Sequence, residues 1–307
     1  MRIVALSGGV GGARFLRGLV RATDPAGVTV IGNVGDDVEV LGMHVSPDLD
    51  SILYALAGVA DDQRGWGRAD ETWIAFEEAA RLGGESWFML GDRDLGLHLV
   101  RTQALAAGEP LSAVTARLAS ALGVEAALLP ATNDRLRTWI DTPDGSFSFQ
   151  EWFVARRHAD DVDRVRFEGE DDATPAPGVV EAIEQAELIV ICPSNPFISI
   201  WPILAVDEIR AVVERRRVPS VAVSPLIGGR AIKGPADRML QRLAGGTDPV
   251  RVATCYPGTI DVLVFDESEA DAASAVEREG VRAVAAPILM RDEAATLALA
   301  QTVLACA

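Results

Sequence analysis

Residues 2–14, RIVALSGGVGGAR, decide the fold class of this chain. The apolar run over residues 2–6 predicts a buried strand, and the amphipathic stretch behind the glycines predicts a helix over residues 12–22. Glycines at the start of a helix let an anion approach the backbone N–H groups and the positive end of the helix dipole. The stretch therefore predicts a phosphate-binding loop, with a tight turn and close helix–strand packing as the alternative. The glycines concerned are Gly8, Gly9, Gly11 and Gly12.

This loop departs from two familiar nucleotide-binding patterns. Arg14 stands where the dinucleotide fingerprint G-x-G-x-x-G has its third glycine, and no Lys-Ser or Lys-Thr pair follows, as a Walker loop requires. A general phosphate loop is therefore favoured over a nicotinamide site. An NAD-dependent dehydrogenase is the disfavoured alternative, because no catalytic pair is evident either.

Strand-like runs alternate with amphipathic stretches at both ends of the chain, which is typical of a parallel sheet covered by helices. The prediction is an α/β fold with a Rossmann-like parallel sheet core, formed by residues 1–60 and 178–307. Residues 61–177 are predicted to be an inserted helical and β sub-domain, in which Gln150 and Phe153 lie on an aromatic strand. Further core strands are predicted at residues 28–31, 188–192, 220–224, 250–254, 262–265 and 282–285.

Composition narrows the class of protein. The chain has 307 residues and a formal net charge of −17, which excludes nucleic acid and anionic membrane surfaces as partners because both need a basic footprint. No apolar run approaches the roughly 20 residues of a membrane span. The three cysteines show neither zinc spacing nor a disulfide framework, so a cytoplasmic location is expected.

Acidic residues follow the second predicted strand, at the edge of the sheet where open α/β folds bind their ligands. Asp36 and Asp37 could bind a ribose hydroxyl or a metal, and Asn33 precedes them. Asp48 and Asp50 flank one residue at the start of a helix, where they could hold Mg²⁺ together with substrate phosphates. The alternative is that these side chains cap turns and helices or are simply solvated.

Three later segments carry polar residues at strand or helix ends. Ser194 and Asn195 lie in a proline-bounded loop that suits recognition of a base or ribose, and Arg230 with Lys233, the only lysine, could contact an anion. Each loop could equally be a plain turn. Residues 91–98, GDRDLGLH, look like an ordinary capped helix start that leaves His98 as a packing residue.

Taken together, seven segments in this order resemble the CofD family, the 2-phospholactate transferases of coenzyme F-420 biosynthesis. The resemblance runs through nearly the whole chain. The segments are SGGVGGAR at 7–14, GNVGDD at 32–37, SPDLD at 46–50, GDRD at 91–94, QEWF at 150–153, PSNP at 193–196 and SPLIGGRAIKGP at 224–235.

The resemblance implies a reaction. A GDP-linked phospholactate or phosphoenolpyruvate unit would be transferred to a ribityl hydroxyl of the deazaflavin Fo, with release of GMP. It also implies dependence on Mg²⁺, a Rossmann-like core, small-molecule substrates and a homodimer. The sequence does not decide between lactate and enolpyruvate.

The resemblance also implies roles for individual residues. Asp50 and Asp48 would be catalytic, Asp50 would orient the acceptor hydroxyl or help to hold the metal, and the inserted sub-domain would contribute to the acceptor site. The acceptor-binding residues would be Asp50, Arg93, Gln150 and Phe153. The nucleotide-binding residues would be Gly8, Gly9, Gly11, Gly12, Asn33, Ser194, Asn195, Arg230 and Lys233. The metal ligands would be Asp36, Asp37, Asp48 and Asp50.

Two positions depart from the family pattern: Asn133 stands where an aspartate is expected, and Trp201 where a smaller residue is common. The alternative function is a nucleotide-sugar-binding regulatory protein, like the gluconeogenesis-factor proteins that have a similar glycine loop. The segments at 47–50 and 150–153 argue against it.

Overall fold

The computed structural model describes residues 1–307 and confirms the predicted fold class. One sheet of seven strands runs through the core in the order β14-β13-β10-β9-β1-β2-β5, and all its strand pairs are parallel. Continuous apolar runs form these strands because helices cover both faces of the sheet. The strands are β1 (Ile3–Ser7), β2 (Val28–Gly32), β5 (Ala127–Pro130), β9 (Leu188–Ile191), β10 (Ser220–Val223), β13 (Val262–Asp266) and β14 (Arg282–Ala286).

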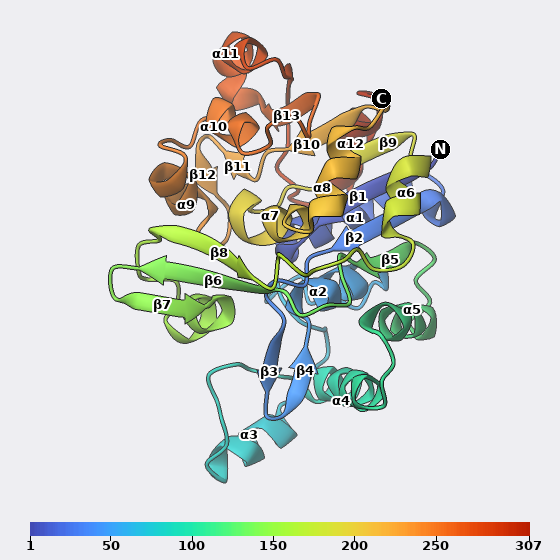
Figure 1. Cartoon of the computed structure of the whole chain (residues 1–307), viewed down its shortest axis with the longest axis vertical. Helices are drawn as coiled ribbons and strands as arrows, with labels where there is room; N and C mark the ends of the chain where they lie inside the picture. The colour runs from blue at the N-terminus through green and yellow to red at the C-terminus, as the bar shows by residue number, and fades with distance from the viewer.

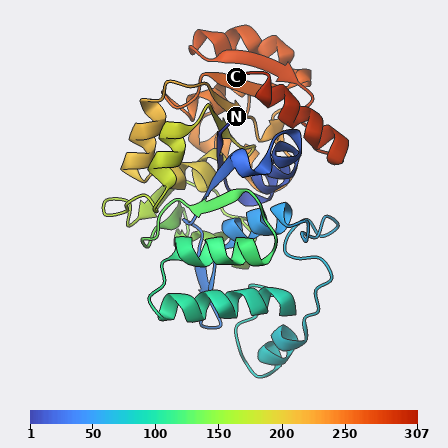
Figure 2. The ribbon, with the colours of Figure 1, turned by 90° about the vertical axis from the view of Figure 1, so that its right-hand side faces the viewer.

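The covering helices lie in two layers. Figure 2 shows α1 and α12 on one side of the sheet and α6 and α8 on the other. The core helices are α1 (Gly9–Ala22), α2 (Pro47–Leu56), α6 (Val179–Gln185), α7 (Trp201–Leu204), α8 (Asp207–Glu214), α9 (Ala236–Leu243), α10 (Pro249–Thr254), α11 (Ala273–Arg278) and α12 (Glu293–Leu304). No helix is long and apolar enough to cross a membrane.

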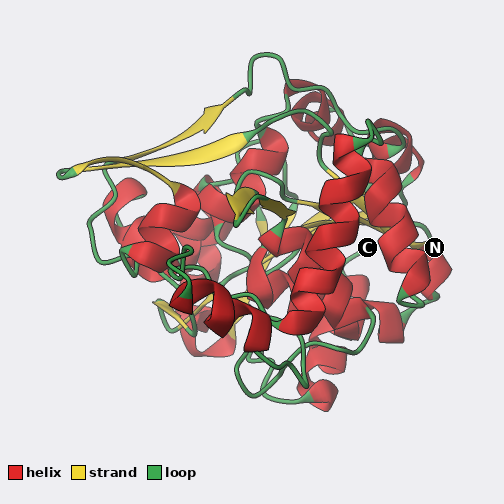
Figure 3. Ribbon diagram, turned by 90° about the horizontal axis from the view of Figure 1, so that it is seen from below, coloured by secondary structure: helices red, strands yellow, loops and turns green.

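The middle of the chain extends away from this core (Figure 1). It contains α3 (Ile74–Arg81), α4 (Asp92–Ala106), α5 (Leu111–Ala121) and a three-stranded sheet in the order β7-β6-β8, which projects to one side of the molecule (Figure 3). Its strands are β6 (Arg137–Thr142), β7 (Gly145–Ser148) and β8 (Arg164–Glu168), and a small hairpin of β3 (Val38–Val40) and β4 (Met43–Val45) precedes α2.

The division at residues 60 and 178 stays an interpretation, and one element crosses it. Strand β5 belongs to the segment 61–177, yet it pairs with β2 as the edge strand of the core sheet. The inserted segment is therefore divided by a core strand into two parts. The helical part is residues 61–126, and the β part is residues 131–177.

Two predicted strands are helical instead. Residues 250–254 form α10, because Asp248 accepts hydrogen bonds from two N–H groups of the first turn and Pro249 occupies its first position. The predicted aromatic strand at 150–153 is wrong as well, since β7 ends at Ser148 and the next segment is η2 (Glu151–Ala155). That helical turn buries Trp152 completely, beside Phe149 and Phe153.

The strand order has a switch point beside β1. Strand β1 lies between β2 and β9, so the connections from these central strands run to opposite faces beyond their carboxyl ends. In open α/β sheets this switch point is where ligands bind. The glycine loop follows β1 at this point, and the segment 193–195 follows β9.

Close packing of α1 on α12 generates a first prediction. A Cβ added at Gly18 would lie 2.8 Å from Thr296 Cγ2 of α12 and would meet the carbonyl of the same residue. We expect Gly18→Ala to lower the free energy of unfolding by about 1–3 kcal/mol, because the two helices would have to move apart. Urea denaturation would measure the change.

Gly96→Ala is the matched control. Gly96 is exposed on α4 and a Cβ there meets nothing within 4 Å. Alanine should raise stability there by up to about 1 kcal/mol through its higher helix propensity. Equal stability of Gly18→Ala and the natural protein would contradict the described packing.

Candidate functional site at the switch point

The glycine loop is closely packed against its neighbours. A Cβ at Gly11 would lie 2.6 Å from the carbonyl oxygen of Pro193, and one at Gly12 would lie 2.6 Å from Ser194 Oγ. At these two positions the glycines serve the predicted alternative, close packing of helix and strand. Gly9 has φ +68°, a left-handed conformation that favours glycine. Val10 and Gly11 are exposed in the first turn of α1, where backbone N–H groups have no intrahelical partner.

The acidic segments after β2 meet this loop. Asp48 Oδ1 accepts a hydrogen bond of 2.6 Å from the backbone N–H of Gly9. The side-chain amide of Asn33 donates to Asp36 Oδ1 at 2.8 Å and to Asp48 Oδ2 at 2.9 Å, and it also reaches the carbonyl of Ile198. One amide therefore holds two carboxylates at the N-terminus of α1.

Burial and mutual repulsion raise the pKa values of these acids. The pKa of Asp36 lies well above its usual value, first through burial and then through the charges of Asp48 and Asp37. Burial also raises the pKa of Asp48 to about 6, although its bonds from Asn33 and Gly9 act in the opposite direction. The cluster thus concentrates more negative charge than the neighbouring donors compensate.

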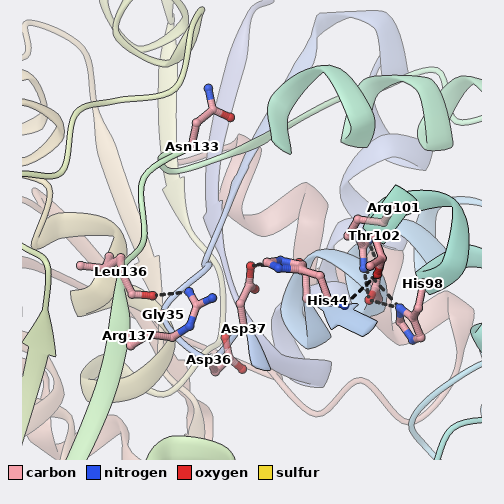
Figure 4. A network of polar contacts seen from close by, with 12 residues as sticks. Gly35, Asp36, Asp37, His44, His98, Arg101, Thr102, Asn133, Leu136 and Arg137 are labelled. Carbon is pink, nitrogen blue, oxygen red and sulfur yellow. Dashed lines mark hydrogen bonds and ion pairs between the residues drawn. The ribbon is translucent and has the colours of Figure 1, made fainter. Parts of the chain in front are cut away.

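Only one of the two carboxylate oxygens of Asp37 has hydrogen-bond partners. Its Oδ2 lies 2.9 Å from His44 Nε2 and accepts a hydrogen bond of 3.0 Å from Ser46 Oγ, and Figure 4 shows the contact with His44. Its Oδ1 is buried without a hydrogen-bond partner. A buried carboxylate oxygen left in this way loses its hydration without replacement.

Asp50 faces a different neighbour. Arg101 of α4 donates from Nη1 to Asp50 Oδ2 at 2.9 Å and from Nη2 to Oδ1, and all three side chains of this group, including His98, are buried. The structure therefore does not bring Asp50 into the network around Asn33. Instead the ion pair with Arg101 joins Asp50 to the inserted segment.

The loop after β9 and the segment 150–153 also reach the cluster. Ser194 Oγ donates to the carbonyl of Gly8 at 2.7 Å, and Gln150 Nε2 donates to the backbone carbonyl of Asp36 at 3.2 Å. Phe153 stacks on Phe149 with ring centroids 5.2 Å apart. Asn195 Oδ1 accepts from Phe197 N–H and so caps η3 (Pro196–Ile200).

The remaining predicted residues lie further out. Arg93, Arg230 and Lys233 are exposed, and none of them takes part in an ion pair. Lys233 Nζ lies against Gly65, so the segment after β12 (Arg230–Ala231) touches the inserted part of the chain. Asn133 is exposed (Figure 4) and accepts a hydrogen bond from the backbone of Ser112.

Trp201 and the start of α4 have structural partners. The indole N–H of Trp201 donates to the carbonyl of Cys255 at 2.9 Å. Glu71 accepts hydrogen bonds from the first backbone N–H groups of α4, while Asp92 of α4 does the same for α3. The segment 91–94 is therefore a capped helix start, and His98 is a buried packing residue, as the simpler interpretation of the sequence holds.

Sequence reasoning missed three residues of this site. Arg101 and His44 hold Asp50 and Asp37, and the charge of Arg137 lowers the pKa of Asp36 in opposition to burial. The only signal for Arg101 is its spacing, because residues 94, 98 and 101 fall on one face of a helix.

The donor chemistry of the cluster fits a hard cation. Buried carboxylate oxygens, one without any partner, supply the ligand type that Mg²⁺ prefers. No group of three or more His, Cys, Asp or Glu side chains is arranged to hold a metal ion. That is compatible with Mg²⁺, which is usually bound by one or two carboxylates plus substrate phosphates and water. The four-aspartate ligand set stays a prediction.

Fold and site together define a Rossmann-like α/β protein with an acidic cluster at the anion-binding end of its first helix. Comparison with known proteins is more specific. Residues 3–300 match the family described as 2-phospho-L-lactate transferase CofD. The chain belongs to this family.

Curated relatives agree with this assignment. A protein named phosphoenolpyruvate transferase from Streptomyces griseus is 44% identical over 99% of this chain and 98% of its own length. One of the same name from Kitasatospora aureofaciens is 45% identical over 100% and 98%. A crystal structure of a upf0052 family member from Bacillus halodurans shares the fold, with a TM-score of 0.64 at 18% identity over 99% of this chain and 98% of that one.

Asp94 generates a prediction about pH. Burial raises the pKa of Asp94 to about 6, and repulsion from Asp50 and Glu71 acts in the same direction, against the hydrogen bond from Tyr54 and the charge of Arg68. A carboxyl whose folded pKa is raised binds its proton more tightly in the folded state, so stability falls as pH rises from about 4 to 6 and stays lower above. We expect Asp94→Asn to raise the free energy of unfolding at pH 8 on the order of 2 kcal/mol, with no gain at pH 4.

Asp92→Asn is the control of opposite sign. Hydrogen bonds from Thr72 and then from Ala75 lower the pKa of Asp92, so its contribution is present at neutral pH and is lost as pH falls. This variant should be less stable than the natural protein at pH 8. Thermal melts at both pH values measure the two effects, and equal pH profiles for the two variants would refute the assignment.

Proposed function

We propose that this chain transfers a phosphoenolpyruvyl group from a GDP-linked donor to the deazaflavin Fo, with release of GMP, in coenzyme F-420 biosynthesis. The names of its relatives support enolpyruvate rather than lactate as the transferred unit. The observation that carries the proposal is the contact of the acidic cluster with the N-terminus of α1 at the switch point of the sheet. A nucleotide-sugar-binding regulatory role is not favoured by the relatives.

Electrostatics supports a divalent cation in this reaction. A diphosphate cannot approach buried carboxylates unless positive charge accompanies it, because like charges repel strongly in a medium of low dielectric. Asp36, Asp37 and Asp48 would hold Mg²⁺ together with donor oxygens and water. Bound there, the ion would polarise the transferred phosphoryl group and stabilise the GMP leaving group.

The residues of this chain then bind and orient the donor. Asp48 takes the Gly9 N–H in the present structure, and turning its carboxylate toward the cation would free that N–H for a phosphate oxygen. The exposed first turn of α1 would provide further donors. Ser194, Asn195, Arg230 and Lys233 would contact the guanosine part. The side chains of Arg230 and Lys233 would add positive charge next to the anionic donor.

The acceptor would bind on the side of the inserted segment. Its hydroxyl oxygen forms a bond to the phosphorus that carries the enolpyruvyl group, the bond from that phosphorus to the GMP oxygen breaks, and the hydroxyl proton is released. Asp50 would accept the hydrogen bond of that hydroxyl and orient it. Arg93, Gln150 and Phe153 would hold the deazaflavin ring. We retain two further expectations: the homodimer that the resemblance implies, and the cytoplasmic location that the cysteines indicate.

The experiment is incubation of the purified protein with Fo, Mg²⁺ and either GDP-linked donor, followed by measurement of product masses. We expect the enolpyruvyl product and stoichiometric GMP, with the phospholactyl donor transferred more slowly. Thermal-shift measurements with UDP-sugars serve as the control for the regulatory alternative. No mass gain on Fo from either donor would refute the transferase.

Asp37 generates a separate prediction about the metal. We expect Asp37→Asn to raise the Mg²⁺ concentration for half-maximal binding and activity at least about tenfold, since loss of a group that holds or orients a metal weakens affinity by that order. Isothermal titration with Mg²⁺ and donor measures it. The control is Asp163→Asn, which removes only an exposed partner of Arg242. An unchanged Mg²⁺ requirement would remove Asp37 from the metal site.

A further inference from the structure

Helix α4 has an unusual distribution of side chains. Beside Leu97 and Ala104 its buried face carries three ionisable residues, Asp94, His98 and Arg101, whereas Leu99 and Val100 are exposed. Ordinary surface helices bury their apolar stripe. The polar residues of α4 face α2, where Asp50 and Tyr54 lie one helical turn apart and accept or donate the matching hydrogen bonds.

The centre of this contact is the pair of Arg101 and Asp50. Its side chains are 1% and 6% exposed, and both carboxylate oxygens accept from the guanidinium. This two-point geometry fixes the plane of the carboxylate, which a single bond from lysine could not do. Arg101 Nε is nevertheless buried without a partner.

Stability alone does not explain such a pair. Desolvation of two buried charges offsets much of their attraction, and well-packed apolar residues of similar size often serve a core as well or better. Burial acts to lower the pKa of Arg101, but the charges of Asp50 and Asp37 outweigh it and raise that pKa. The pair therefore connects the inserted segment to the acidic cluster in both geometry and charge.

His98 contacts the guanidinium of Arg101 and does not compete with it for the carboxylate of Asp50. Burial lowers the pKa of His98 to about 4, so the ring is neutral at physiological pH. Its Nδ1 lies 3.4 Å from Arg101 Nη1 and 3.8 Å from Asp50 Oδ2. A neutral ring nitrogen facing a guanidinium is an acceptor, which places the ring proton on Nε2.

We propose that Arg101 is a positioning residue of the transfer reaction: it holds the carboxylate of Asp50 in the orientation that receives the acceptor hydroxyl. This inference rests on the proposed function and adds to it the residue that sets the geometry. Each Asp50 oxygen keeps a lone pair after bonding to Arg101. The inserted segment, through α4, thereby orients the reacting hydroxyl as well as contributing to binding.

The test uses Arg101→Met and Arg101→Lys with the natural protein in the transfer assay. We expect Arg101→Met to lower kcat about a hundredfold, the order expected for a misplaced reacting group, with KM for the GDP-linked donor unchanged. Arg101→Lys keeps the positive charge but cannot form the paired hydrogen bonds to both oxygens of Asp50, so it should recover only part of kcat. Arg117→Met is the control, because Arg117 lies on the neighbouring α5 and makes only an exposed ion pair, with Glu109.

A double-mutant cycle separates positioning from structure. If Arg101 acts through Asp50, adding Arg101→Met to Asp50→Asn costs no further activity, whereas independent roles would multiply the losses. Natural kcat in Arg101→Met, or losses that multiply, would overturn the inference. Should Arg101→Met fail to fold, Arg101→Lys alone and with Asp50→Asn decides, and unimpaired kcat in Arg101→Lys overturns the inference. Absence of transfer by the natural protein would instead refute the proposed function.

Discussion

Four aspartates, Asp36, Asp37, Asp48 and Asp50, are buried at the carboxyl end of the first two core strands, and the rest of the structure accommodates them. An ionised carboxylate removed from water is strongly unfavourable unless hydrogen bonds or opposite charges replace its hydration. The start of α1, the position of α2 and the docking of α4 each supply such groups. Packing in this region therefore follows from the placement of the acids.

The four carboxylates are not equally compensated by hydrogen bonds and opposite charges. Compensation is least complete at the aspartates that are proposed to hold Mg²⁺. Asp50 has a complete partner in Arg101, Asp48 has the end of α1 and Asn33, and Asp37 keeps one oxygen without a partner. The raised pKa values of Asp36 and Asp48 express the same deficit. A divalent cation that accompanies a diphosphate would supply the missing positive charge.

The inserted segment takes part in the site from two directions. Gln150 reaches the backbone of Asp36 from the β part, and α4 reaches Asp50 from the helical part. Figure 1 shows these two parts on either side of the hairpin of β3 and β4. The core thus holds the donor end of the proposed site, and the insertion holds the acceptor end, so that both substrates would meet at α2.

Much of the fold and the outline of the site could be predicted from residue order alone. Apolar runs and glycines are local signals, so β1, the glycine loop and the acids after β2 are visible in the sequence. Helix caps are local signals as well. At 250–254, however, the apolar pattern predicted a strand, and the cap formed by Asp248 with Pro249 starts a helix instead, so the strand prediction was wrong. Alternation at 150–153 misled in the same way, because a helical turn can also bury Trp152.

The sequence by itself determined the parallel sheet, the glycine loop after its first strand and the supply of carboxylates near that loop, because each depends on neighbours a few positions away. Only the tertiary structure decided which acid meets which partner. Arg101 and Asp50 are 51 positions apart, and on a helix pattern Arg101 looks like a solvated charge. Its role appears only when Arg101 of α4 meets Asp50 of α2, since an ion pair between distant segments depends on distance in space and leaves no period along the chain.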